Sequence, residues 1–167
     1  MLISEKALDS KPYNTTRNYD VTWENCSLRK WLNETFLNNA FSAEEQALIQ
    51  STTVSADKNP DYSTDPGNAT TDKVFLLSIT EAEKYFDSDK ARRCAPTAYA
   101  IAQGAYTNDG CKTADGDACC WWRLRSPGIF QEHAANVSLD GAVYSYGHSV
   151  YYVHDGVRPT IWVSLES

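Results

Sequence analysis

The sequence changes character at Trp121, and this change most limits how the chain can fold. After this position, short apolar or alternating runs are separated by glycine: WWRLRSPG, AANVSLDG, AVYSYG, SVYYVHDG and VRPTIWVSL. Such runs are typical of β-strands joined by turns. Because the part before Trp121 reads as helical, the whole predicts an α+β fold, with helices packed on a small antiparallel sheet.

The first predicted helix lies near the N-terminus. Thr22 or Asn25 can cap it, because both residue types accept hydrogen bonds from the first free backbone N–H groups. Apolar residues then recur at intervals of three and four, which makes one apolar stripe: Leu28, Trp31, Leu32 and Phe36. This face is expected to pack on the core.

Two further helices are predicted from capping boxes. Ser42 precedes Glu45 by three residues, and Thr80 precedes Glu83 by the same interval. The apolar run Val74–Ser78 comes just before the second box and predicts a buried strand. A further helical stretch covers residues 91–105 and is interrupted by a proline.

Two long segments are predicted to be loops. Residues 51–72 and 106–118 are rich in Gly, Pro, Asn, Asp, Ser and Thr, which form turns more readily than they pack. Loops of this length in a compact domain are usually functional or mobile.

Length and charge narrow the class of protein. A chain of 167 residues is the right length for one domain with its own core, and we predict a single domain over residues 1–167. With 15 Lys plus Arg against 22 Asp plus Glu, the net charge is −7, and the arginines are scattered. Nucleic acid is not expected as a partner, because phosphate binding uses clustered positive charge.

The sequence also indicates a compartment. It shows no apolar run long enough to span a membrane and no secretory signal at its start. The five cysteines leave at least one unpaired: Cys26, Cys94, Cys111, Cys119 and Cys120. A reduced, intracellular chain is therefore predicted. The alternatives are a cell-surface or virion setting, and a single bridge from Cys111 to Cys119 or Cys120 if the protein is exported.

Motifs for catalysis or metal binding are few. His133, His148 and His154 match no zinc spacing, and we predict no metal and no cofactor. Residues 108–117 carry oxygen ligands but lack the ligand spacing of an EF-hand, which favours a solvated turn over a weak calcium loop. The sequence contains no nucleophile elbow and no phosphate-binding glycine loop.

The tryptophans and one arginine are expected to be structural. Trp121, Trp122 and Trp162 lie in strand-like runs, and large aromatic side chains supply much of the burial energy of a small domain. Arg158 has apolar neighbours and is predicted to be partly buried, bonded to backbone carbonyls or to a carboxylate.

Several ordered segments carry a resemblance to a known family. KVFLLSITEAEKYF, WWRLRSPG, AANVSLDGAV and GVRPTIWV resemble an uncharacterised bacterial and phage domain family that is common in gut Firmicutes. The C-terminal pattern also resembles the C-type-lectin fold of formylglycine-generating enzymes and of the variable proteins of diversity-generating retroelements. Members of the first family commonly have an aromatic residue or leucine where this chain has Arg123, which puts the packing of that strand in doubt.

The retroelement resemblance has a consequence that the sequence can test. Randomised adenines in such systems turn AAC codons into NNC, which never encodes Lys, Glu, Gln, Met or Trp. Residues 133–161 contain none of these types. The sequence is consistent with a variable region, which the resemblance implies over residues 129–158, and a constant domain of the same family is the alternative.

The resemblance divides this region into a frame and displayed residues. The frame is Gly141, Val143, Gly147, Val150, Gly156, Val157, Arg158 and Pro159. The displayed ligand-binding residues are Tyr144, Ser145, Tyr146, His148, Ser149, Tyr151, Tyr152, His154 and Asp155, with an adjoining patch of Phe130, Gln131, Glu132, His133, Ser138 and Leu139. Tyrosine and serine are also what antibody paratopes favour, because tyrosine offers a large rigid contact area.

The predicted function is therefore non-enzymatic display of a binding surface. The partner would be a protein or a carbohydrate, held by tyrosine faces and by hydrogen bonds from Ser, His and Asp, with surface histidines making binding sensitive to pH near 6.5. One alternative is a constant assembly module of a bacterial surface or phage-tail protein. Another is an enzyme that resembles formylglycine-generating enzymes, although adjacent Cys119 and Cys120 do not reproduce their cysteine pair.

Overall fold

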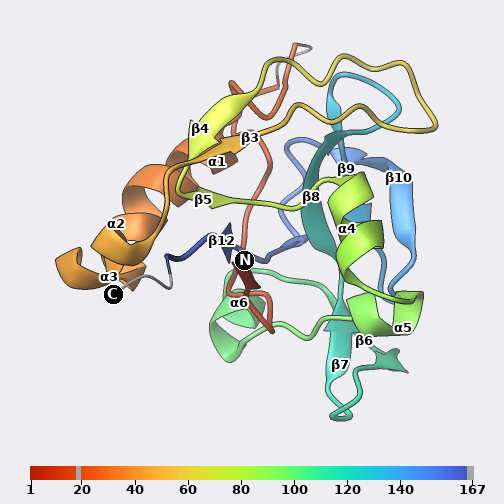
Figure 1. Ribbon diagram of the computed structural model, residues 1–167. Helices are drawn as coiled ribbons and strands as arrows, with labels where there is room; N and C mark the ends of the chain where they lie inside the picture. The colour runs from red at the N-terminus through yellow and green to blue at the C-terminus, as the bar shows by residue number, and fades with distance from the viewer. Residues whose placement is uncertain (18–19, 165–167) are drawn as a thin grey trace.

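The computed structural model describes residues 1–17 and 20–164 and has the predicted α+β class (Figure 1). The helical segments are α1 Ser27–Trp31, the π-helical turn η1 Leu32–Phe36, α2 Leu37–Ala40, α3 Ala43–Leu48, α4 Ile79–Tyr85, α5 Asp89–Arg92 and α6 Ala98–Ala102. The strands are β1 Leu2–Ile3, β2 Asp9–Ser10, β3 Thr52–Val54, β4 Thr70–Asp72, β5 Val74–Phe75, β6 Thr107–Lys112, β7 Ala118–Cys120, β8 Trp122–Pro127, β9 His133–Val137, β10 Val143–Ser149, β11 Gly156–Val157 and β12 Thr160–Ile161. The predicted order of helices first and strands second holds only in part, because β1 to β5 all precede Leu76.

The largest sheet has the strand order β10-β9-β8-β11-β2 and carries the predicted binding region. Neighbouring strands are antiparallel except β11 and β8, which run parallel where Gly156 pairs with Trp122. The sheet is therefore mixed, whereas an antiparallel sheet was predicted. β10 is an edge strand, so no further strand pairs with its outer side.

The two ends of the chain are joined through smaller pairings. β1 pairs with β12, which pairs with β5, and β2 pairs with β11. Figure 1 shows the N-terminus in the middle of the molecule beside β12. The N-terminal strands therefore hold the segment that follows the predicted binding region.

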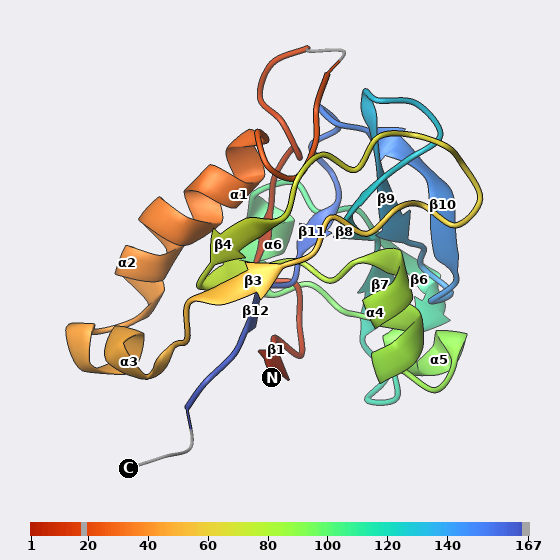
Figure 2. The same ribbon diagram turned by 45° about the horizontal axis from the view of Figure 1, so that its top comes forward.

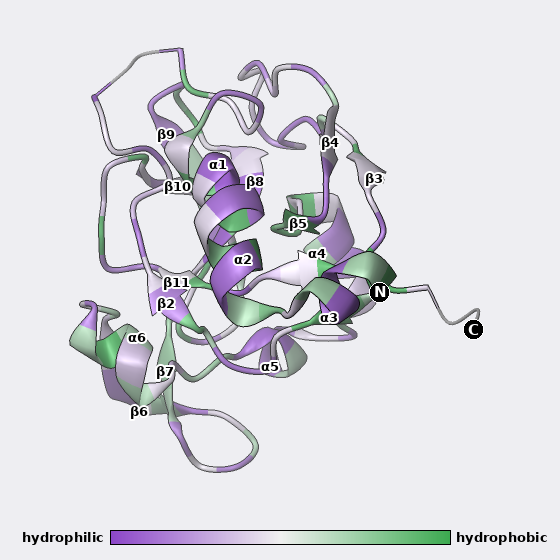
Figure 3. Cartoon of the chain, turned by 90° about the vertical axis from the view of Figure 1, so that its left-hand side faces the viewer, coloured by the Kyte–Doolittle hydropathy of each residue, from purple (hydrophilic) through white to green (hydrophobic). Residues whose placement is uncertain are grey.

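The rod formed by α1, η1 and α2 covers one side of the molecule (Figure 2). Its N-cap is Cys26, whose Sγ accepts a hydrogen bond from Arg29 N at 3.4 Å. The predicted caps Thr22 and Asn25 are wrong, because they bond each other in the preceding turn. Figure 3 shows a mostly hydrophilic outward face. The inward face buries Leu28, Leu32 and Leu37.

One of the two predicted capping boxes is confirmed, and the other is wrong. At Ser42 and Glu45 both reciprocal bonds are present. The box predicted from Thr80 is wrong, because Ser78 and Glu81 form it two residues earlier. The strand before this helix is shorter than predicted, so the helix begins sooner.

Both segments predicted as loops contain strands. Residues 51–72 include β3 and β4, and residues 106–118 include β6 and the start of β7. The part between β3 and β4 passes over the large sheet (Figure 2). There the buried Asn59 donates from Nδ2 to Pro127 O and to Ser145 O, each at 2.8 Å. This segment is therefore anchored beside β10.

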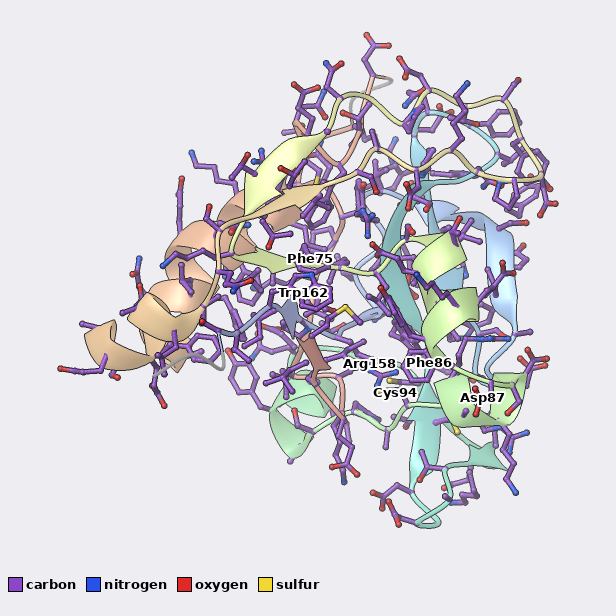
Figure 4. All side chains as sticks on the ribbon, viewed as in Figure 1. Phe75, Phe86, Asp87, Cys94, Arg158 and Trp162 are labelled. Atoms are coloured by element: carbon purple, nitrogen blue, oxygen red, sulfur yellow. The ribbon has the colours of Figure 1, made fainter. Side chains whose placement is uncertain are left out.

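The structural prediction is confirmed for Arg158 and for two of the three tryptophans. Arg158 donates from Nε to Ser4 O at 3.0 Å, and its guanidinium lies 4.6 Å from the ring centroid of buried Trp122. Figure 4 shows Arg158 beside Phe86, whose ring centroid is 5.3 Å away. Trp162 packs partly buried against the core. Trp121 differs, since it faces the outer surface of the sheet.

Candidate functional site

The four predicted tyrosines are all exposed. The exposed fractions are 39% for Tyr144, 40% for Tyr146, 40% for Tyr151 and 37% for Tyr152. On β10 the rings of Tyr144 and Tyr146 share one face, with centroids 5.9 Å apart and planes 30° apart. The predicted exposure of these rings is confirmed, while their binding of a ligand stays a prediction.

Ring contacts join these tyrosines to the predicted histidines. The ring centroid of His133 lies 5.7 Å from that of Tyr146 and 5.5 Å from that of Phe130. Toward the turn after β10, the ring centroid of Tyr152 lies 4.8 Å from that of His148 and 5.2 Å from that of His154. We call the connected set the aromatic surface: Tyr62, Trp121, Phe130, His133, Tyr144, Tyr146, His148, Tyr152 and His154.

Two members of the aromatic surface, Trp121 and Tyr62, were not predicted from the sequence. Trp121 was assigned to the core, but its ring lies 4.7 Å from His148 and 5.7 Å from Tyr144. Adjacent tryptophans in an extended segment point to opposite faces, so one of the pair had to face outward. Tyr62 comes from the segment anchored by Asn59 and lies 6.4 Å from Tyr146. Its loop was recognised as long, but nothing in the sequence indicated its position.

Tyr151 belongs to a separate part of the surface. Its ring stacks under Arg17, whose guanidinium carbon lies 4.5 Å from the centroid. No ring contact joins Tyr151 to the aromatic surface within residues 1–17 and 20–164. The two adjacent tyrosines therefore diverge, as their neighbouring positions predict, and only Tyr152 belongs to the connected set.

The display predicted for Asp155 is wrong, because this carboxylate is fully buried beneath the aromatic surface. Arg123 Nε lies 3.1 Å from Asp155 Oδ2, and both side chains are 0% exposed. Asn136 Nδ2 donates to the same oxygen at 3.1 Å, and His148 Nδ1 lies 2.9 Å from Oδ1. A buried charge needs a partner and hydrogen bonds, and Asp155 has both.

The charge state of Asp155 fixes the orientation of protons on His148. Burial opposes ionisation, but Arg123 and the bonds from His148 and Asn136 outweigh it and hold the pKa of Asp155 below its ordinary value. An ionised carboxylate only accepts, so the bond to it requires a proton on His148 Nδ1. Asn136 Nδ2 lies 2.7 Å from the same His148 Nδ1 and would require the opposite arrangement, in which Nδ1 accepts a hydrogen bond.

The free energies of the two possible hydrogen bonds decide which way the Nδ1 proton points. A hydrogen bond to a charged group contributes about 1.5–3 kcal/mol, against about 0.5–1.5 kcal/mol between neutral groups. The Nδ1 proton therefore points to Asp155. Nε2 makes no hydrogen bond within the described part of the chain, and the side chain is 24% exposed. Neutral His148 thus offers Nε2 as an acceptor among the rings.

Arg123 also holds the turn that carries Tyr152. Its Nη2 donates to Ser149 O at 3.0 Å and to Tyr152 O at 2.8 Å. Arg123, whose packing the resemblance put in doubt, is fully buried and pairs with Asp155. These hydrogen bonds restrain the turn beneath the rings, because buried bonds hold the groups that they join.

The remaining predicted residues are half-buried and mostly bonded to the backbone. Gln131 Nε2 donates to Val21 O and Asp65 O, and Glu132 O accepts from Val150 N. Ser138 Oγ donates to Asp140, and Leu139 O accepts from Cys111 Sγ. Ser145 O accepts from Asn59, and Ser149 Oγ is buried with no partner in the described residues. Of this group, only Gln131 and Ser138 are held by hydrogen bonds of their own side chains in these contacts.

The adjacent cysteines contact different partners. Cys119 is hydrogen-bonded to Cys111 and Cys120 to Cys94, and all five thiols are free. Burial, followed by the Cys111 bond, raises the pKa of Cys119 to about 12. The bridge between Cys111 and Cys119 that the sequence left open is therefore absent here, although the two thiols are neighbours.

The region predicted as a solvated turn or weak calcium loop forms the β6–β7 hairpin. Asp109 pairs with Lys112, and Asp117 pairs with Lys6. Among residues 1–17 and 20–164, no group of three or more His, Cys, Asp or Glu side chains is placed to hold a metal ion.

His133 gives a prediction for the pH dependence of stability. Partial burial is the main cause that lowers the pKa of this imidazole below its ordinary value of 6.5. The folded state therefore prefers neutral His133, and this stability is lost as pH falls below about 6.5. We expect the wild type to lose more stability than His133→Phe between pH 7 and pH 5, measured by urea unfolding. Parallel losses in the two proteins would contradict it.

The fold and this site define the class: an α+β domain with a rigid, solvent-exposed aromatic surface on an edge strand. The chain belongs to the DUF6273 family, a domain of unknown function whose model matches residues 1–165. No curated protein and no solved structure matches the chain. Within the described residues, no helix has both the length and the apolar character needed to cross a membrane.

Proposed function

We propose that this chain is a non-enzymatic ligand-binding domain with a C-type-lectin-like fold, which recognises a protein or a glycan through the aromatic surface. The observation that carries the proposal is the unbroken set of ring contacts from Phe130 to His154 across β10 and the following turn. Monomeric proteins rarely expose large contiguous apolar patches unless these bind something.

The construction of the surface supports recognition over simple packing. The Arg123–Asp155 pair lies beneath the rings, and Arg123 also holds the backbone of Tyr152. Preorganised aromatic side chains lose little conformational entropy on binding, which is why tyrosine dominates antibody paratopes.

We further propose that residues 129–158 are the variable region of a diversity-generating retroelement. The frame expected from that resemblance is largely buried, including Gly141, Gly147, Val150 and Val157, and the residues between these positions are more exposed. Such a pattern would let side chains vary while the backbone stays fixed.

The coding DNA tests the retroelement proposal. We expect a nearby reverse-transcriptase gene and a near-copy of the segment for residues 129–158 that differs mainly at adenines. A locus with neither feature would leave a constant domain, and the variable-region proposal would fail.

Binding itself is tested with two tyrosine variants. Tyr144→Ala and Tyr152→Ala are each expected to weaken ligand binding tenfold or more, about 1.4 kcal/mol, because exposed aromatic anchors carry much of the energy of an interface. Ligands are identified on a peptide display library and a glycan array, and affinities are then measured by calorimetry.

The matched control is Tyr99→Ala, since Tyr99 is 60% exposed on α6 and makes no ring contact with the aromatic surface in the described residues. Unchanged affinity in the control and reduced affinity in both surface variants supports the proposal. If no ligand is bound, or if the surface variants bind as tightly as the wild type, the proposal fails. Defined oligomers lost in the same variants would favour the assembly module instead.

A further inference from the structure

A hollow of about 470 Å³ lies beside the aromatic surface. Its lining includes Trp121, Asn108 from β6, and the turn residues Ser138, Leu139 and Asp140. The hollow is wide open to solvent, so a ligand in it would contact the protein mainly through one face. The hollow joins two parts of the chain that the sequence did not connect: the β6–β7 hairpin and the turn between β9 and β10.

Trp121 connects the hollow to the aromatic surface. The indole contacts Tyr144 and His148 and also lines the hollow. Its Nε1–H makes no hydrogen bond with any residue of the described chain. The indole can therefore offer a ring face to the C–H groups of a ligand and one N–H donor at its edge.

The hollow also contains an acceptor, the carboxylate of Asp140. Asp140 uses Oδ1 to accept from Ser138 Oγ and from Ala142 N, the latter at 3.1 Å. Its Oδ2 has no partner in the described residues. The bond from Ser138 is the main cause that holds the pKa of Asp140 below its ordinary value, so the carboxylate is ionised at neutral pH. Outside the lining, His148 Nε2 is a further acceptor beside the indole, whose ring centroid lies 4.7 Å from that of His148.

Charge argues against an anionic ligand. Among the described residues, no lysine or arginine lines the hollow. Arg93, which is near Asp140, donates to the backbone oxygens of Asp140 and Lys112 instead. The chain carries a net charge of −7. A ligand that fits must present several donors, one apolar face and no negative charge, and a neutral pyranose has all of these properties.

We infer that the hollow beside Trp121 binds one neutral pyranose residue of a glycan, whose neighbouring residues lie along the aromatic surface. The sugar stacks its C–H face on the indole and donates a hydroxyl hydrogen bond to Asp140, and the neighbouring residue of the glycan donates one to His148. This inference rests on the proposed function and names its ligand class as carbohydrate. A protein ligand would be the contrary outcome.

The experiment titrates the isotope-labelled full chain with neutral hexasaccharides built from glucose, galactose, mannose, xylose or N-acetylglucosamine, and with sialyllactose as the anionic comparison. We expect at least one neutral hexasaccharide to shift the Trp121 indole N–H resonance with a dissociation constant at or below about 1 mM. Trp121→Ala should weaken that binding at least tenfold, whereas Trp121→Phe should retain most of it.

His148 is tested with a matched pair of variants. His148→Gln can place an acceptor near the former Nε2, whereas His148→Asn can reach only Asp155. Partial binding by the first and loss by the second is expected, with Tyr99→Ala unchanged. Thermal unfolding of each variant checks that it folds.

Each contrary result has a distinct meaning. If no neutral hexasaccharide binds but a peptide ligand depends on Tyr144 and Tyr152, the sugar site is wrong and the proposed function stands. Tighter binding of sialyllactose would overturn the neutral class, and full binding by Trp121→Ala would overturn the location. If neither sugars nor peptides bind, both proposals fail.

Discussion

Replacement of Asp155 by alanine is expected to lower the free energy of unfolding by about 3–5 kcal/mol, because it leaves Arg123 charged and unpaired in the protein interior. The same change removes the partner of His148 Nδ1 and a partner of Asn136. Denaturant unfolding followed by circular dichroism measures the loss. If Asp155→Ala does not fold, Asp155→Asn keeps the shape and still removes the charge.

The pH dependence gives an independent check on this pair. The folded pKa of Asp155 is depressed, so its contribution is present above the unfolded value of about 3.9 and is lost as pH falls through the folded value. The stability difference between the wild type and Asp155→Asn should therefore be full at pH 7 and should shrink below about pH 4. A difference that is constant with pH would argue against a charge effect.

An exposed ion pair supplies the control. Lys112 and Asp109 also form a close pair, but their side chains are 47% and 89% exposed. Exposed pairs contribute little because water screens them and side-chain entropy opposes them. Asp109→Ala should leave stability almost unchanged. A comparable loss at both aspartates would show that burial does not decide the effect.

The second large effect is expected at Gly147, where alanine should cost at least about 2 kcal/mol. Gly147 has φ +75°, a region that costs a residue with a Cβ about 1–2 kcal/mol. An added Cβ would also lie 2.3 Å from Ala134 O on β9. The β9–β10 register shifts between Tyr144 and His148, so the glycine allows the bulge that places these rings.

Gly116 separates the two causes. It has φ +86° but no atom within 4 Å of an added Cβ. Gly116→Ala should cost only the backbone strain, about 1–2 kcal/mol. Thermal unfolding of both variants gives the comparison, and changes in the Tyr144 and His148 resonances should appear only for Gly147→Ala. Equal losses would mean that the contact with Ala134 O is unimportant.

Local sequence patterns predicted much of the fold. The capping box at Ser42 needs only residues within one turn, whereas alternation on β10 left open whether Tyr144 and Tyr146 point inward or outward, and both are exposed. The misplaced box at Thr80 shows the limit of such patterns. Ser78 and Glu81 have the same three-residue spacing as Thr80 and Glu83, so spacing alone does not show which pair caps the helix.

The sequence by itself determined the α+β class, because strand alternation and glycine turns act over a few residues, whereas the exposure of the tyrosines in the last third was predicted only from the resemblance. Only the tertiary structure decided that Asp155 is buried under Arg123, and that Trp121 and Tyr62 join the surface. The physical reason is that burial and ring contact depend on neighbours from distant parts of the chain. Arg123 and Asp155 are 32 positions apart in the sequence and meet only after β8 and β11 pair.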